Sequence, residues 1–156
     1  MRAERWTRAF GFIWAGVACV IAGGLVSAAT APSPSEKGSW AAAYLVLVGG
    51  VAQIGLGVGQ AWLASDVAST SLTRLTSFQL VGWNIGNAAV IGGTLSDLTP
   101  IVDVGGALLV ATLVACVGQV RRPARRGLPL QAFRALVVLL VVSIPVGLVL
   151  AQLAGD

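Results

Sequence analysis

The sequence contains no histidine and few charged residues, and both shortages exclude classes of function. Without histidine the chain lacks the usual axial ligand of a membrane haem, a common zinc ligand and the commonest general base. Only 10% of its residues are charged, whereas soluble domains carry about 25%. There is too little polar surface to cover a soluble particle, and a Ser–His dyad is impossible.

Cysteine is scarce as well, and catalytic motifs are missing. Cys19 and Cys116 each lie inside an apolar run. Because their estimated membrane depths differ, we expect no disulfide, and their spacing is not that of metal ligands. The chain has no phosphate-binding loop and no CxxC, HExxH or GxSxG motif. We therefore expect a protein that is not an enzyme and that has no metal and no cofactor.

What the sequence does have is long apolar runs. Hydrophobic residues make up 56% of the chain, and several runs approach the roughly 20 residues that a helix needs to cross a bilayer. These properties predict an all-α fold, an integral membrane helical bundle that forms a single transmembrane domain over residues 1–156. The candidate transmembrane helices cover residues 9–29, 40–64, 75–95, 100–120 and 132–153.

The first apolar run has features of a signal peptide. Arg2, Arg5 and Arg8 precede it, and Ser27–Ala29 could serve as a cleavage site. The run over residues 9–29 is longer than the roughly 7–15 residues of a typical signal-peptide core. We therefore interpret it as an uncleaved first span.

Residues 75–95 are the least apolar of the five candidates, and their hydropathy leaves the crossing undecided. Eight strongly apolar residues offer only about −2 to −5 kcal/mol, and Gln79, Asn84 and Asn87 could offset most of it. The distribution of positive charge favours a crossing. If these residues did not cross, the arginine cluster at 121–126 would be forced outside, against the positive-inside rule.

With five crossings and an internal N-terminus, nearly all the positive charge lies inside. Lys37 alone lies outside, and the inner residues are Arg2, Arg5, Arg8, Arg74, Arg121, Arg122, Arg125, Arg126 and Arg134. The sequence thus predicts a multi-pass protein of a bacterial cytoplasmic membrane with its N-terminus in and its C-terminus out. The net charge of +4 is explained by this topology, so we expect no nucleic-acid partner.

Two halves of the chain can be aligned. A shift of 69 positions matches Trp14 with Trp83, together with pairs of glycine, serine and threonine residues further on. Two interpretations stay open. One is a parallel repeat of two helical hairpins followed by a fifth helix, an arrangement known in some transporters. The other is chance similarity between helices of low complexity.

Polar side chains recur near the middle of the spans. At 1.5 Å per residue, Gln53, Asn84, Asn87, Thr112 and Ser143 all fall near the midplane of a bilayer. They could pair across helices as structural contacts. They could instead form a neutral binding site for a small molecule, a lipid headgroup or an ion. The hypothesis to test is that Gln53, Asn84 and Asn87 line one such site.

Other features concern packing and partners. Gly55 and Gly59, and likewise Gly82 and Gly86, have the small-xxx-small spacing that lets helices approach closely, within the chain or in a homo-oligomer. Arg121, Arg122, Arg125 and Arg126 are typical of a topology signal that contacts anionic membrane lipids, or of a docking patch for a cytoplasmic partner.

These inferences favour a non-catalytic membrane bundle, or an accessory subunit that binds a membrane-protein partner. The alternative is a small transporter or channel for a neutral or amphipathic solute that uses the polar side chains near the midplane. A third class, an enzyme acting on lipid headgroups with Asp97 or Asp103 at the outer face, has the weakest basis, because two carboxylates six positions apart are a weak signal.

Overall fold

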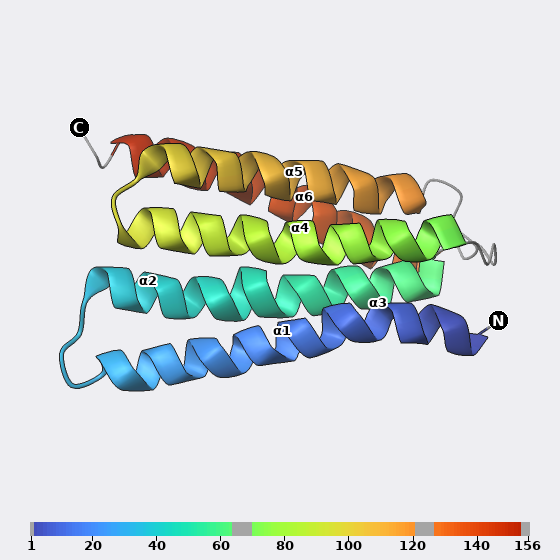
Figure 1. Ribbon diagram of the computed structural model, residues 1–156, viewed down its shortest axis with the longest axis horizontal. Helices are drawn as coiled ribbons and strands as arrows, with labels where there is room; N and C mark the ends of the chain where they lie inside the picture. Colours follow the sequence, from blue (N-terminus) through green and yellow to red (C-terminus); the bar gives the residue numbers. More distant parts are fainter. Residues whose placement is uncertain (1, 64–69, 121–126, 154–156) are drawn as a thin grey trace.

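The computed structural model describes residues 2–63, 70–120 and 127–153, and the regular structure in these ranges is helical. Its elements are α1 (Arg2–Thr30), α2 (Glu36–Tyr44), the π-helix η1 (Leu45–Ala52), α3 (Gln53–Leu63), α4 (Thr70–Leu95), α5 (Thr99–Gln119) and α6 (Leu128–Leu153). Because α2, η1 and α3 follow without a break, they form one continuous helix, the second rod. The predicted all-α fold is confirmed: five rods lie side by side and alternate in direction (Figure 1).

Local sequence determines where the rods begin and end. The Ser35 side chain accepts a hydrogen bond from the Gly38 amide at 3.1 Å, so the second rod starts at Glu36 rather than at the predicted residue 40. At the end of α4 the Leu98 amide donates to the Gly93 carbonyl at 2.8 Å. Asp97 completes this turn with φ 56°, a left-handed conformation that aspartate tolerates better than most residues.

The rods are organised as two closely packed hairpins. In the first, a Cβ atom on Gly16 of α1 would lie 2.9 Å from the Gly50 carbonyl oxygen of the second rod. In the second, a Cβ atom on Gly105 of α5 would lie 2.8 Å from the Gly86 carbonyl oxygen of α4. Such distances leave no room for a side chain, so glycine allows backbone to touch backbone, as in many membrane helix pairs.

The two hairpins lie alongside each other in matching register. α1 and α4 run in the same direction (Figure 1), and a Cβ atom on Gly11 would lie 2.8 Å from Leu80 Cδ2. Gly11 and Leu80 are 69 positions apart, which is the shift that aligns Trp14 with Trp83 in the sequence. Residues paired by that shift therefore lie at similar depths.

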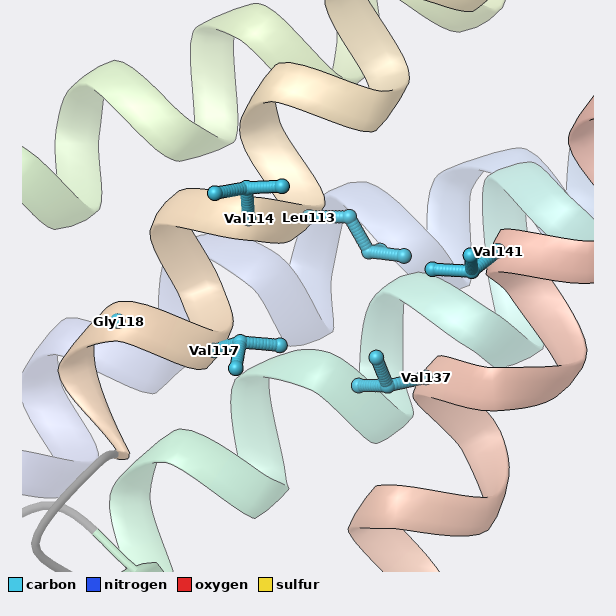
Figure 2. Close-up of a pocket in the computed structure, with 6 residues that line it drawn as sticks. All are labelled: Leu113, Val114, Val117, Gly118, Val137 and Val141. Carbon is cyan, nitrogen blue, oxygen red and sulfur yellow. The ribbon is translucent and has the colours of Figure 1, made fainter.

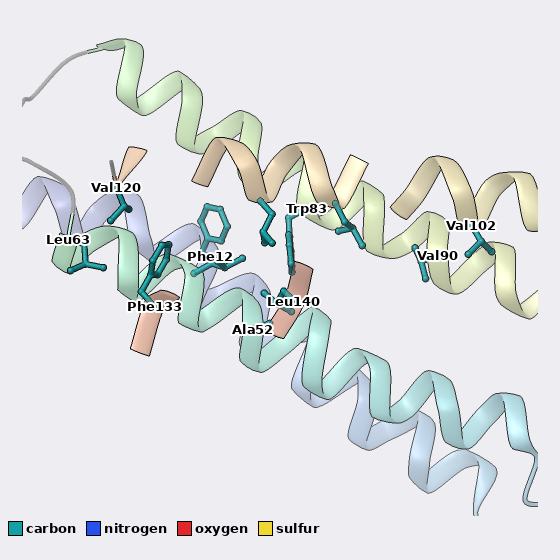
Figure 3. Close-up of a cluster of buried hydrophobic side chains, with 12 residues drawn as sticks. Phe12, Ala52, Leu63, Trp83, Val90, Val102, Val120, Phe133 and Leu140 are labelled. Carbon is teal, nitrogen blue, oxygen red and sulfur yellow. The ribbon is translucent and has the colours of Figure 1, made fainter. Parts of the chain in front are cut away.

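The fifth rod, α6, closes the bundle against α5 and α3. A Cβ atom on Gly55 of α3 would lie 2.7 Å from Leu136 Cδ2, and one on Gly59 would overlap the Phe133 ring. The buried apolar core is shared by all the rods: Phe12 of α1, Ala52 of η1, Trp83 of α4 and Leu140 of α6 belong to the same cluster (Figure 3).

Most of these rods have the length and composition of membrane helices. Ala9–Thr30 of α1, Glu36–Leu63 of the second rod and Thr99–Gln119 of α5 are each long and apolar enough to cross a membrane. Leu128–Ile144 of α6 is a shorter apolar helix. Among the described residues, α4 is not apolar enough to count as a membrane-spanning helix by the same criterion of length and hydropathy. This agrees with the undecided hydropathy of residues 75–95. The chain is therefore a helical protein with a multi-pass membrane character.

The two hairpins also share an ion pair at one end of the bundle. Lys37 Nζ lies 2.7 Å from Asp97 Oδ1 and 2.6 Å from Asp97 Oδ2. Lys37 is in the first turn of α2 and Asp97 follows α4, so the contact bridges the first hairpin and the second. Both side chains are well exposed, and such a surface pair contributes only about 0–1 kcal/mol.

Candidate functional site

The candidate site is a group of buried polar side chains on α3 and α4, the polar seam, which consists of Gln53, Gln60, Gln79, Trp83 and Asn87. All five are at least nine-tenths buried, and Gln53, Gln79 and Trp83 have no exposed surface at all. On α4 the residues recur every fourth position, which places Gln79, Trp83 and Asn87 along one face over two turns. On α3, Gln53 and Gln60 are seven positions apart and likewise share a face.

The polar seam holds seven nitrogen and oxygen atoms without a hydrogen-bond partner among the described residues. They are both amide atoms of Gln53 and of Gln79, Nε2 of Gln60, Nε1 of Trp83 and Oδ1 of Asn87. A buried polar atom without a partner costs about 1–3 kcal/mol, and native proteins satisfy the great majority of such atoms. These seven atoms, three on α3 and four on α4, have hydrogen-bonding capacity that the described residues do not use.

Polar residues of α5 lie beside α4, which carries three members of the polar seam. A Cβ atom on Gly82, next to Trp83, would lie 2.8 Å from the Thr112 hydroxyl. One turn further along α5 lies Cys116, which is fully buried. Further still, Gln119 Nε2 donates to the Thr76 hydroxyl at 3.5 Å. Polar groups therefore extend from the centre of the bundle toward the end where α4 begins.

The local sequence around Gln53 is unusual in its helical geometry. The eight residues Leu45–Ala52 form a π-helix, and Gln53 is the first residue of α3 that follows it. The segment includes Gly49 and Gly50, which are buried against α1. π-helical turns widen a helix, redirect the side chains that follow and occur frequently at functional sites. Here the change in geometry immediately precedes the fully buried Gln53 amide.

The structure places the residues predicted from the sequence in different surroundings. Gln53, Asn87 and Thr112 are buried in the bundle. Asn84 is half-buried, and its Nδ2 donates to the Leu80 carbonyl of its own helix at 2.8 Å. Ser143 is exposed on α6, where its hydroxyl donates to the Leu140 carbonyl at 3.2 Å. Asn84 and Ser143 therefore do not belong to the polar seam.

Asn87 and Thr112 also use their own helices for part of their hydrogen bonding. Asn87 Nδ2 donates to the Trp83 carbonyl at 2.8 Å, and the Thr112 hydroxyl donates to the Leu108 carbonyl at 2.8 Å. For Asn87 this leaves the amide oxygen as the free group. Asn87 therefore presents a hydrogen-bond acceptor to the polar seam.

Three members of the polar seam were not predicted as site residues from the sequence: Gln60, Gln79 and Trp83. Gln60 shares a face with Gln53, and Gln79 and Trp83 share one with Asn87, so the helical spacing of polar side chains was the available signal. Trp83 was not predicted because a tryptophan in an apolar helix is most simply interpreted as a packing residue.

Among the described residues, no charged side chain belongs to the polar seam. The predicted lipid-contacting residues Arg121, Arg122, Arg125 and Arg126 lie outside the described residues. Asp97 pairs with Lys37 at the opposite end of the bundle, and Asp103 is exposed on α5. Within residues 2–63, 70–120 and 127–153, no three His, Cys, Asp or Glu side chains are grouped so that they could hold a metal ion.

Comparisons of the chain with protein-family models, with curated proteins and with solved structures found no match. Function must therefore be argued from the polar seam itself. Its groups are neutral: the amides supply both donors and acceptors, and the indole supplies a donor. Apolar side chains such as Phe12, Leu56 and Leu113 are buried in the same bundle. The groups of the polar seam can donate and accept hydrogen bonds without carrying charge.

Proposed function

We propose that the chain is a small, non-catalytic protein of a bacterial cytoplasmic membrane and that it crosses the bilayer five times. The doubtful crossing is α4, and its packing supports the proposal. α4 contacts α5 along its length, from Thr76 with Gln119, through Gly86 with Leu109, to Gly93 with Val102. Because α5 has the length and apolarity of a membrane helix, a partner that lies along all of it occupies the same depth range.

The proposed orientation has the N-terminus inside and the C-terminus outside. α1 begins at Arg2 at the end of the bundle where α4 and α6 also begin (Figure 1). The described arginines near this end, Arg74 and Arg134, are exposed, whereas the opposite end has Lys37 paired with Asp97. An excess of arginine marks the cytoplasmic side, and five crossings then bring the C-terminus to the outer side.

We further propose that the protein is a transporter or channel that passes a small neutral solute along the polar seam. The observation that carries this proposal is the set of seven buried polar atoms that have no partner among the described residues. A solute with hydroxyl or amide groups would replace its lost water contacts with hydrogen bonds to Gln53, Gln79 and Asn87. The described residues offer an ion no opposite charge there to offset the large penalty of dehydration.

The prediction is that purified protein accelerates the entry of small neutral solutes into liposomes. Glycerol and urea are suitable probes because each carries several hydrogen-bonding groups and no charge. Flux is followed by light scattering as the vesicles swell after an osmotic shock. We expect Gln79→Met to reduce the flux to that of protein-free liposomes, because the substitution keeps the length of the side chain and removes its hydrogen bonds.

A matched control is Gln131→Met, which changes an exposed glutamine at the start of α6. This variant should retain the wild-type flux. Equal flux for wild-type protein and Gln79→Met would contradict the transport proposal. Wild-type protein that passes neither probe and purifies with another membrane protein in fixed stoichiometry would support the second candidate function below.

The second candidate is an accessory subunit in a larger membrane assembly, and Trp14 favours it. Trp14 lies three residues beyond Gly11 on α1, as Trp83 lies three beyond Leu80 on α4, so both indoles occupy the middle of the bundle. Trp83 is fully buried, but Trp14 is 70% exposed. Tryptophan prefers the membrane interfaces, and an indole N–H facing hydrocarbon lacks a partner. A helix of a partner protein that packs against Trp14 could supply a hydrogen-bond acceptor for the indole N–H.

A further inference from the structure

An apolar groove runs between α5 and α6 on the outside of the bundle (Figure 2). It has a volume of about 140 Å³ and is lined by Leu113, Val114, Val117, Gly118, Val137 and Val141. Side chains from the two helices face each other across it (Figure 2). Gly118 has no side chain to fill the groove, and a Cβ atom there would meet nothing within 4 Å. Leu113 belongs to the buried core, whereas Val114, Val117, Gly118 and Val141 are exposed on the outside of the bundle.

A positive charge lies on the same face of α6 as the groove. Arg134 is three positions before Val137 and seven before Val141, so the three residues share one side of the helix. α5 and α6 are antiparallel, and Val117 and Gly118 of α5 line the groove together with Val137 of α6. Arg134 is one turn beyond that level, near the end of α5 at Val120, and it is exposed.

We propose that this groove and Arg134 together form a binding site for an anionic phospholipid of the inner leaflet. The site rests on the proposed membrane crossing and is independent of solute transport. One acyl chain lies between Val117 and Val137, and the guanidinium of Arg134 binds the phosphate. Arginine suits this role because its planar array of donors matches phosphate oxygens and its long side chain reaches the headgroup region.

The apolar lining of the groove and the charge near it favour a lipid as the occupant. The groove is lined by aliphatic side chains and a glycine, and Arg134 lies one turn before Val137 on α6. A single extended acyl chain can lie along such a groove. The headgroup specificity follows from charge, because anionic lipids are concentrated on the cytoplasmic side and each basic residue near the surface attracts them.

The test is a titration of the detergent-purified, delipidated full-length protein with phosphatidylglycerol, and with phosphatidylcholine of the same acyl chains. Native mass spectrometry gives the fraction of protein that carries one lipid. We expect tighter binding of phosphatidylglycerol, and about a fivefold loss of that affinity in Arg134→Gln. Gly118→Leu should reduce the binding of phosphatidylglycerol as well, because the new side chain occupies the groove.

Two control variants make the result specific. Arg74→Gln removes an exposed arginine near the same end of the bundle, on α4, away from the groove. Gly92→Leu adds the same side chain at another glycine with nothing within 4 Å of a Cβ atom. Both should bind phosphatidylglycerol as the wild type does. Equal binding of the two lipids, wild-type affinity in Arg134→Gln or in Gly118→Leu, or an equal loss in the controls would each overturn the proposal.

Discussion

Isoleucine in place of Gly105 is expected to lower the free energy of unfolding by about 3 kcal/mol, the upper range for overpacking a tight interface. A Cβ atom at this position would lie 2.8 Å from the Gly86 carbonyl oxygen, 2.9 Å from Ala89 Cβ and 2.9 Å from the Val90 amide nitrogen. These neighbours are backbone atoms or a short side chain, so no rotamer change can make room. α4 and α5 would have to separate.

Unfolding of the purified protein by SDS in mixed micelles, followed by tryptophan fluorescence, measures this change. Gly92→Ile is the matched control, since it makes the same substitution on α4 where a Cβ atom would meet nothing within 4 Å. It should unfold close to the wild-type midpoint. If the two variants unfold together, the close contact between α4 and α5 does not exist as described.

Replacing the two fully buried glutamines is expected to change both the free energy of unfolding and the solute flux. We expect the double variant Gln53→Met, Gln79→Met to be more stable than the wild type, by about 1–3 kcal/mol for each glutamine, while it loses solute flux. Methionine has a similar length and packs in apolar surroundings, and the substitution removes four buried polar atoms that have no partner among the described residues. A site kept for function commonly has such a penalty in stability.

The same unfolding assay decides between the two interpretations of the buried amides. If Gln53 and Gln79 served as structural contacts between helices, their loss would destabilise the bundle by about 0.6 kcal/mol per hydrogen bond. Gln119→Met is the control for that case, because its amide donates to the Thr76 hydroxyl. A double variant that is less stable than the wild type would contradict a role for these glutamines in binding a solute.

Much of the fold could be predicted because the bilayer restricts what an apolar chain can do. Long apolar runs with arginines at their ends can form only helices that satisfy their own backbone, and the all-α fold follows. Residues 75–95 remained undecided by hydropathy because Gln79, Asn84 and Asn87 reduce the apolar gain. What makes α4 part of the bundle is its glycine contact with α5 through Gly86, which depends on tertiary structure.

The site could be predicted only in part. The sequence indicates how deep in the membrane each residue lies, but it does not indicate whether the side chain faces the inside of the bundle. Counting along each span indicated that Gln53, Asn84, Asn87 and Thr112 share a level. Which of them faces inward depends on how each helix is rotated against its neighbours. Thus Asn87 is buried whereas Asn84, three positions away, is half-buried. The π-helix at Leu45–Ala52, which precedes Gln53, had no clear signal beyond Gly49 and Gly50 within it.

Trp14 and Trp83 also show that the direction of a side chain cannot be predicted from its depth. Trp14 and Trp83 align at the shift of 69 positions, and Gly11 and Leu80, which contact each other, have that separation. The parallel repeat of two hairpins itself stays a prediction. The surroundings of the two indoles are nevertheless opposite, because α4 lies between the second rod and α5 while α1 is at the edge of the bundle (Figure 1).

The central claim is that α4, with its buried polar side chains, crosses the membrane as one of five spans. The most direct measurement is the location of the C-terminus in whole cells, by paired fusions to a reporter active only outside and a reporter active only inside. Five spans with an internal N-terminus predict activity of the outer reporter alone. Activity of the inner reporter alone would mean an even number of crossings and would contradict the membrane-spanning position of the polar seam.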